Sequence, residues 1–285
     1  MPGHPLISVI IPCFNAAFFL QEAIESVLNQ NYPNLQLIVV NDGSTDNSLK
    51  IAKQYEKDNV LIIDKLNTGV SDSRNQGAQI AKGKYLAFLD ADDVWKAEKL
   101  KESIEVFEEH NVGLVHTYME VINEESLPTG EILKGKKGNL LESLLLWNGC
   151  NIPSPSSILI SKSAFDEVGG FDPSFSTAAD QDFFFRLATK FNVGIVKKPL
   201  GQYRVHSNNM HSNNELMEKD HIGVYEKASK AGLFKSKSFE KKCFANLYKI
   251  LAGSWWKDGN NKLKGLKFII KSILIYPPIV KKYFS

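Results

Sequence analysis

Two carboxylates occupy alternate positions directly after an apolar run. The run is Tyr85-Leu-Ala-Phe-Leu89, and Asp90-Ala91-Asp92 follows it. Alternate residues just past a strand can direct two side chains to one site, and Mg²⁺ or Mn²⁺ binds few carboxylates together with phosphate oxygens and water. Such a cation would act as a Lewis acid toward a diphosphate leaving group. The competing interpretation is an acidic helix N-terminus, which the helix dipole favours.

A second polar segment, Asn41-Asp42-Gly43-Ser44-Thr45-Asp46, also follows an apolar run. An Asp-Gly pair after a strand is an ordinary turn, and Asp46 is an ordinary N-cap for a helix. The functional alternative is that the Asp42 carboxylate accepts the N3–H of a uracil ring. These residues alone leave both interpretations open.

Alternating apolar strands and amphipathic helices must position these segments. The β-α-β-α order predicts a parallel sheet with helices on both faces. Ligands of such sheets bind beyond the carboxyl ends of the strands, so Asn15, Asn41–Ser44 and Asp90–Asp93 are expected to converge in space. The expected strands are 6–11, 35–40, 60–63 and 85–89, and the expected helices are 17–30, 46–57 and 70–82.

The pattern becomes mixed after residue 111. It predicts strands at 112–118 and 155–160 and a helix at 180–190, and the Gly- and Lys-rich segment 123–139 is expected to be a mobile loop. Helices are expected beyond residue 215. The chain is therefore divided into a domain over 1–214 and a basic helical C-terminal extension over 215–285.

An ordered series of short motifs resembles the family 2 glycosyltransferases over about the first three quarters of the chain. Any single motif is weak, whereas the series in the expected order and spacing is specific. The matching segments are Ser8-Val-Ile-Ile-Pro12-Cys-Phe-Asn15, Val40-Asn-Asp42-Gly-Ser-Thr-Asp46, Asn67-Thr-Gly69, Ser73-Arg74-Asn75, Gly77, Tyr85 to Asp93, Gly169-Gly-Phe171-Asp172, Asp180-Gln-Asp182, Arg186 and Tyr203-Arg204-Val-His206.

The resemblance implies the GT-A fold, an α/β arrangement with a Rossmann-like, mostly parallel central sheet flanked by helices. It places nucleotide-sugar binding in about 1–95 and acceptor binding in about 96–214. It also implies roles for single residues. The base pocket, usually for uracil, would include Pro12, Phe14, Asn15, Asp42 and Arg74; Asp90 would contact the ribose, and Asp92 would bind Mn²⁺ or Mg²⁺ beside the donor diphosphate.

Asp180 stands where the family has its catalytic base. The chain departs from the family pattern at the preceding position, where Ala179 replaces the usual Glu, so Asp182 is the alternative base. In a helix these two carboxylates point about 200° apart, and only one of them can face the site. Arg204 and His206 belong to a stretch that lines the diphosphate in the family, and His206 also suits a metal position.

The implied function is that of an inverting hexosyltransferase that takes a nucleotide-sugar, with a UDP-sugar favoured, and a saccharide or lipid-linked acceptor in polysaccharide or glycan assembly. Asp180 would take the proton of the acceptor hydroxyl as it attacks the anomeric carbon. The alternative is a catalytically silent nucleotide-sugar binding module that recruits partners through its tail. A nucleotidyltransferase usually carries a Gly-rich phosphate loop, and Ser8–Asn15 contains no glycine; a processive synthase needs membrane spans and a Q-x-x-R-W stretch, which are absent.

Charge is unevenly distributed along the chain. Residues 215–285 hold 15 lysines and 6 acids, a net charge of +9, whereas residues 1–214 carry −7. Segment 259–285 holds six lysines and no acid, interleaved with apolar residues. It is expected either to lie on an anionic membrane surface or to pack on the core with a solvated lysine face. Nucleic acid is not an expected partner, because no reading module is present.

The location expected from the sequence is the cytoplasm. If the tail binds a membrane, the protein is expected to be peripheral on the inner face of that membrane. Three cysteines without a C-x-x-C pair indicate neither a disulfide framework nor a zinc site. No signal peptide is recognised. No uninterrupted apolar run approaches the roughly 18 residues that span a bilayer.

Overall fold

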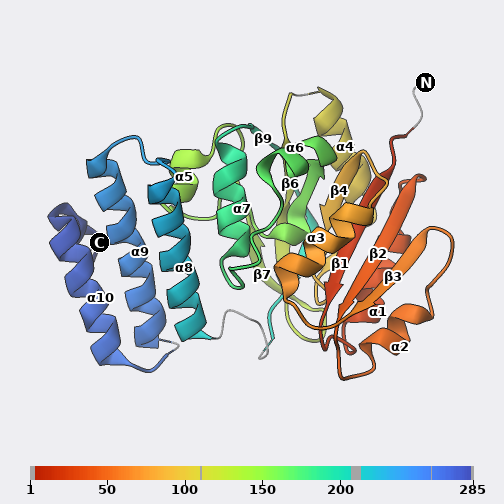
Figure 1. The fold of residues 1–285 in the computed structure, drawn as a ribbon, viewed down its shortest axis with the longest axis horizontal. Coiled ribbons are helices and arrows are strands. Elements are labelled where there is room, and N and C mark those ends of the chain that lie inside the picture. The colour runs from red at the N-terminus through yellow and green to blue at the C-terminus, as the bar shows by residue number, and fades with distance from the viewer. Residues whose placement is uncertain (1–3, 110, 207–212, 258, 284–285) are drawn as a thin grey trace.

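The computed structural model describes residues 4–109, 111–206, 213–257 and 259–283. Its centre is one mixed sheet in the order β3-β2-β1-β4-β8-β6-β9-β5, with β7 paired to β6. The predicted α/β class with a central sheet flanked by helices is confirmed (Figure 1). The strands are β1 (Ile7–Cys13), β2 (Leu35–Asp42), β3 (Val60–Lys65), β4 (Tyr85–Phe88), β5 (Val94–Trp95), β6 (Leu114–Ile122), β7 (Pro128–Leu133), β8 (Ile158–Ser161) and β9 (Val193–Arg204).

The first four strands are parallel, as the β-α-β-α order predicts. β1 lies between β2 and β4, and β3 continues the sheet beyond β2. The connecting helices are short: α1 (Leu20–Leu28), α2 (Ser48–Lys53) and α3 (Val70–Ile80). α2 is shorter than the expected helix at 46–57; Asp46 still accepts the N–H of Ser48 at its start, at 2.9 Å.

The second half of the sheet is mostly antiparallel. β8 pairs antiparallel with both β4 and β6, whereas β9 runs parallel to β6. The predicted mobile loop at 123–139 is wrong in part, because β7 lies inside it and forms an antiparallel hairpin with β6. The expected strand at 155–160 also begins later than predicted, since Pro155–Ser157 form a 3₁₀ turn before β8.

Both faces of the sheet are buried, which explains why its strands are continuous apolar runs. Alternate residues of β1 point to opposite cores: Ile10 faces one cluster, and Val9 and Ile11 face the other. The Ile10 side is covered by α3, α6 (Lys162–Val168) and α7 (Ala179–Ala188), and the Val9 side is covered by α1 and α4 (Lys99–Glu109).

The C-terminal helices extend the Ile10-side core. They are α8 (Asn214–Lys230), α9 (Lys237–Lys257) and α10 (Lys262–Ile275), and they form a block at the end of the molecule away from β1–β3, with α10 outermost (Figure 1). The Tyr225 hydroxyl donates to the carbonyl of Leu145 at the end of α5 (Leu141–Leu145), at 2.8 Å. Because buried residues of α8, α9 and α10 belong to the same cluster as Ile10, the extension packs on the sheet domain.

Candidate functional site

The loops after β1 and β2 are joined beyond the carboxyl ends of these strands. The Asn15 side-chain oxygen accepts the backbone N–H of Thr45 at 2.8 Å, and the backbone N–H of Asn15 donates to Ser44 Oγ at 3.0 Å. Asn15 has φ 49°, a left-handed conformation that Asn tolerates better than most residues. The predicted convergence of Asn15 with the segment after β2 is therefore present.

Asp42 fixes the loop that leads from β3 into α3. Its Oδ1 accepts the N–H of Thr68 at 2.8 Å and an ion pair from Lys65, and its Oδ2 accepts the N–H of Gly69 at 2.9 Å. A carboxylate has about four acceptor positions, so these contacts leave room for one more donor on Oδ2. The loops are tightly packed here, since a Cβ on Gly43 (φ 70°) would lie 2.8 Å from the Asn67 nitrogen.

Arg74 of α3 reaches the segment after β4. Its Nη2 lies 2.5 Å from Asp90 Oδ1, and its guanidinium carbon lies 5.1 Å from the centre of the Phe171 ring. The neighbouring Asn75 bonds both backbone groups of Phe171, accepting its N–H at 2.9 Å and donating to its carbonyl at 2.7 Å. α3 therefore ties the Asp90 segment to the Gly-Gly-Phe-Asp loop that precedes α7.

Asp180, in the first turn of α7, lies in the electrostatic field of Arg74 and Asp90. Burial raises the pKa of its carboxyl above the ordinary value; the charge of Arg74 opposes this shift, and that of Asp90 adds to it. Arg74 comes from α3, Asp90 from the segment after β4 and Asp180 from α7. The Asp180 carboxylate, whose pKa is raised, therefore lies within electrostatic range of the Arg74–Asp90 ion pair.

Asp182 is held in a different network. Its Oδ2 accepts Arg186 Nε and Nη2 at 2.8 and 2.7 Å, and its Oδ1 pairs with Lys227 Nζ of α8 at 2.8 Å. The side chain is 4% exposed. Both carboxylate oxygens are thus engaged in ion pairs, so Asp182 is a poorer candidate for a proton acceptor than Asp180.

Asp92 faces His206 across the sheet edge. Asp92 Oδ2 and His206 Nε2 lie 3.0 Å apart, and the His206 ring packs against Phe19 with centroids 4.9 Å apart. Asp93, next in the chain, is buried and accepts the backbone N–H of Arg204 at 2.9 Å. Burial, and then the neighbouring charges of Asp92 and Asp90, raise the pKa of Asp93 well above its usual range.

Arg204, which the resemblance places at the diphosphate, is buried. Its side chain is 0% exposed, donates from Nε to the carbonyl of Asp92 at 2.7 Å and pairs with Glu22 at 2.6 Å. The guanidinium also donates to the carbonyl of Asn123 at 3.1 Å. The guanidinium thus supports the backbone of Asp92 and contacts both the β6–β7 hairpin and α1.

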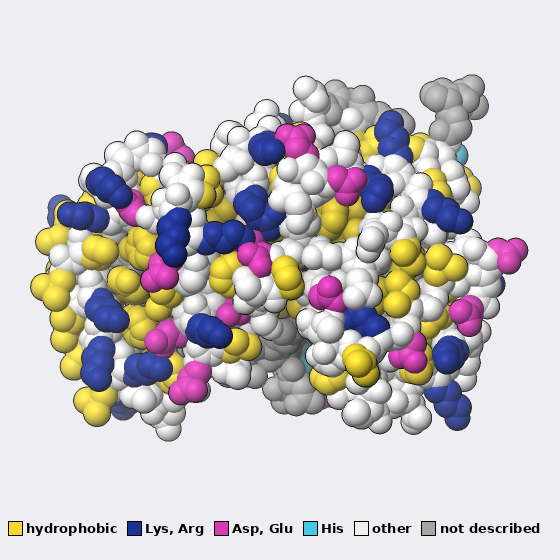
Figure 2. Space-filling view, viewed as in Figure 1, with side chains coloured by type: hydrophobic (Ala, Val, Ile, Leu, Met, Phe, Trp, Pro, Cys, Tyr) yellow, Lys and Arg dark blue, Asp and Glu magenta, His cyan; other side chains and the backbone are white. Residues whose placement is uncertain are grey.

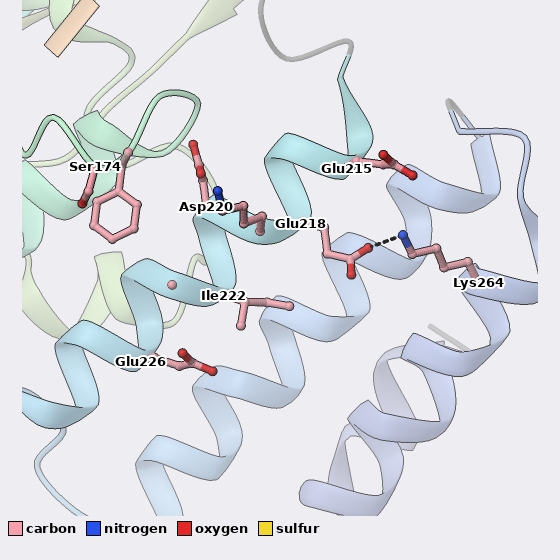
Figure 3. A pocket seen from close by; sticks show the side chains of 10 residues that line it. Ser174, Glu215, Glu218, Asp220, Ile222, Glu226 and Lys264 are labelled. Atoms are coloured by element: carbon pink, nitrogen blue, oxygen red, sulfur yellow. Dashed lines mark ion pairs between the residues drawn. The ribbon is translucent and has the colours of Figure 1, made fainter. Parts of the chain in front are cut away.

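Residues of α8 that no sequence motif marks hold the loop before α7. Asp220 Oδ2 accepts the N–H groups of Ser176 and Thr177, both at 2.8 Å, and His221 contacts the Gln181 side chain at 2.9 Å. Figure 3 shows this side of α8, where a pocket of about 430 Å³ lies between the loop, α8 and α10. The contacts join positions some 40 residues apart, so no local motif marks them.

Replacing Asp220 by Ala is expected to lower the free energy of unfolding by about 1–3 kcal/mol, because two partly buried backbone N–H groups lose their acceptor. The turnover number should fall with little change in KM, since the loop before Asp180 is loosened. Urea unfolding and initial rates check both effects. Glu226→Ala, on the same helix, is the control, and Asp220→Asn should restore part of the loss. Equal behaviour of the Ala variants would contradict this role.

Comparisons with known proteins agree with this fold. The family model described as "Glycosyl transferase family 2" matches residues 8–169, more than half of the chain. An uncharacterised glycosyltransferase of Nostoc sp. (strain PCC 7120) is 33% identical over 72% of this chain and 66% of its own length. The Bacillus subtilis protein TuaG, provisionally named a teichuronic acid biosynthesis glycosyltransferase, is 27% identical over 81% of this chain and 92% of its length. The chain spans just under two thirds of the first two relatives.

Solved structures share the fold at lower identity. Staphylococcus aureus TarS 1–349, in complex with UDP-GlcNAc, has a TM-score of 0.65 at 19% identity, covering 94% of this chain and 79% of its own. The mannosyltransferase PcManGT of Pyrobaculum calidifontis, in complex with GDP-Man and Mn²⁺, has a TM-score of 0.60 at 15% identity, covering 96% and 87%. These structures extend the similarity into the C-terminal helices.

Proposed function

The chain belongs to glycosyl transferase family 2, and from this premise we propose that it moves a sugar from a nucleotide-sugar donor to a saccharide or lipid-linked acceptor with inversion of the anomeric centre. The observation that carries the proposal is the Arg74–Asp90 ion pair beyond the carboxyl ends of the parallel strands, with Asp180 near enough for both charges to act on its carboxyl group. There a carboxylate of raised pKa stands beside the segment that carries Asp92.

The proposed donor is a UDP-sugar. Support comes from Asp42, whose Oδ2 keeps one unused acceptor position, the kind of group that the N3–H of uracil requires, and from the exposed Phe14, whose ring could cover a base. TarS, a protein of similar fold, was solved with UDP-GlcNAc. Pro12 and Asn15 complete the proposed base pocket beside Arg74, and Asp90 is proposed to contact the ribose.

A divalent metal, Mn²⁺ or Mg²⁺, is part of the proposal, and the donor atoms at the Asp92 segment suit it. Asp92 and His206 would supply a carboxylate oxygen and an imidazole nitrogen. Over the described residues, no group of three or more His, Cys, Asp or Glu side chains is placed to hold a metal. When bound, the metal would offset the negative charge that grows on the departing diphosphate. The Mn²⁺ complex of PcManGT is consistent with this chemistry.

The chain's own residues are proposed to orient the reactants and move one proton. Arg74 holds Asp90 in place, so that the ribose contact is fixed before the donor binds. Asp180, when ionised, accepts the proton of the acceptor hydroxyl as it attacks the anomeric carbon. Arg204 fixes the backbone of Asp92 by donating a hydrogen bond to its carbonyl. Residues 1–95 would then bind the donor, 96–214 the acceptor, and 215–285 support the loop before α7.

The test is calorimetric titration of UDP and GDP into the purified chain, each with and without Mn²⁺, followed by release of nucleotide from UDP-sugars. We expect UDP to bind more tightly than GDP and its affinity to rise with Mn²⁺. Preferential GDP binding would keep the family and overturn the uracil assignment at Asp42. If the folded protein bound neither nucleotide, the proposed function would be wrong.

A further inference from the structure

α10 leaves an apolar stripe uncovered. Its inner face, with Gly265, Phe268 and Ser272, is buried against α9. Its outer face carries four large apolar residues at intervals of three and four, which a helix places on one side. Their exposed fractions are 77% for Leu263, 46% for Leu266, 49% for Ile270 and 76% for Leu274.

A further exposed apolar residue lies near the start of α10, at the end of α9. Trp256 is 46% exposed, and the Lys262 Nζ lies 6.0 Å from the centre of its ring. Figure 2 shows hydrophobic side chains gathered along this edge of the molecule, with Lys or Arg side chains beside them. Trp combines a large apolar ring with a polar N–H and is favoured where an apolar surface meets water.

A lysine-lined groove runs beside the stripe. It has a volume of about 370 Å³ and is lined by Leu263, Phe268, Lys264, Lys267 and Lys271, together with Glu218 and Asn261. Glu218 pairs with Lys264 at 2.9 Å, as Figure 3 shows. In the described part of the chain no ion pair involves Lys267 or Lys271, so the groove has a net positive charge next to the apolar stripe.

From this juxtaposition we propose that α10 is a membrane-binding helix: the stripe enters the interface of a bilayer, and the lysine groove receives an anionic phospholipid headgroup. Such a helix lies in the plane of the interface with its apolar face inserted. Each lysine near the surface adds to the attraction toward anionic lipids. A second copy of the chain is a poorer partner, because two such faces would bring lysines of like charge together.

The proposed helix lies on the membrane and does not cross it. None of the helices in the described ranges is long and apolar enough to span a bilayer. α10 has 14 residues and is about 21 Å long at 1.5 Å per residue. The inference goes beyond glycosyl transfer and uses none of the residues of the proposed active site, so the two can fail independently.

The experiment is co-sedimentation of the whole chain with phosphatidylcholine vesicles, with and without phosphatidylglycerol, alongside nucleotide binding. We expect binding to the anionic vesicles that weakens with salt and is not displaced by inorganic phosphate or glycerol phosphate. Leu266→Glu with Ile270→Glu, and separately Lys267→Gln with Lys271→Gln, should each weaken it about tenfold or more. All variants should keep the wild-type thermal unfolding transition, which shows that they fold whether or not the chain binds nucleotide.

Matched controls separate this surface from general effects. Leu127→Glu with Ile132→Glu changes two exposed apolar residues at β7, and Lys50→Gln with Lys53→Gln removes two exposed lysines of α2. Both should bind vesicles like the wild type. The proposal is overturned if the wild type ignores anionic vesicles, if the stripe variant binds them unchanged, if soluble phosphates displace the protein, or if light scattering finds a wild-type dimer that the stripe variant abolishes.

Discussion

Asp180→Asn is expected to lower kcat by about 10²–10⁴-fold with nearly unchanged nucleotide affinity, since general base assistance is worth about that much. The amide is close in shape to the carboxylate but cannot accept the hydroxyl proton. Initial rates of nucleotide release from a UDP-sugar, with and without acceptor, measure the loss, and calorimetry with UDP checks binding. Asp166→Asn, an exposed carboxylate on α6, is the control.

The pH profile gives a second readout of the same residue. Burial raises the pKa of Asp180, and the base must be ionised to accept a proton. Therefore kcat should fall as the pH drops through this raised pKa, at a higher pH than for an ordinary carboxyl group. The fall should disappear from the residual activity of Asp180→Asn. A full-rate Asp180→Asn enzyme would assign the base elsewhere, as would an inactive but normally stable Asp182→Asn enzyme.

Asp92→Ala is expected to abolish the effect of Mn²⁺ on UDP affinity and to reduce kcat/KM by about 10²–10³-fold. Charge stabilisation by a metal is worth several kcal/mol, and each 1.4 kcal/mol is tenfold. Titrations of UDP with and without Mn²⁺ should give the same affinity in this variant. Asp58→Ala, in an exposed position before β3, should keep the wild-type difference.

The outcome of the Asp92 experiment also separates two roles of this segment. If Asp92 holds the metal, His206→Ala should reduce the Mn²⁺ effect as well, because His206 Nε2 faces the same carboxylate. If Mn²⁺ raised the UDP affinity of Asp92→Ala as much as that of the wild type, this segment would not bind the metal. Asp92 and Asp93 would then be acidic residues of a strand end that stabilise Arg204 and the backbone around it.

Local sequence determined the first half of the fold and the main positions of the site. β1, β2 and β4 are short apolar segments that can be recognised from neighbouring residues alone. The polar residues at their ends meet because the carboxyl ends of parallel strands lie at one edge of the sheet. Asn15, Asp42 and Asp90 could therefore be placed from their positions at or just after the ends of strands. Side-chain period and turn chemistry act over a few residues, and these signals are present in the chain itself.

Tertiary structure alone decided the contacts that join distant segments. β7 was missed because its residues are mostly exposed and show no alternation of apolar and polar side chains, so only pairing with β6 identifies it as a strand. The burial of Arg204 depends on Glu22, 182 positions earlier in the chain, and that of Asp182 on Lys227 of α8. Residue type gives the charge of such groups but not their partners. The same holds for α10. Its apolar residues and lysines are visible in the sequence, but only packing on α9 determined which of them face outward.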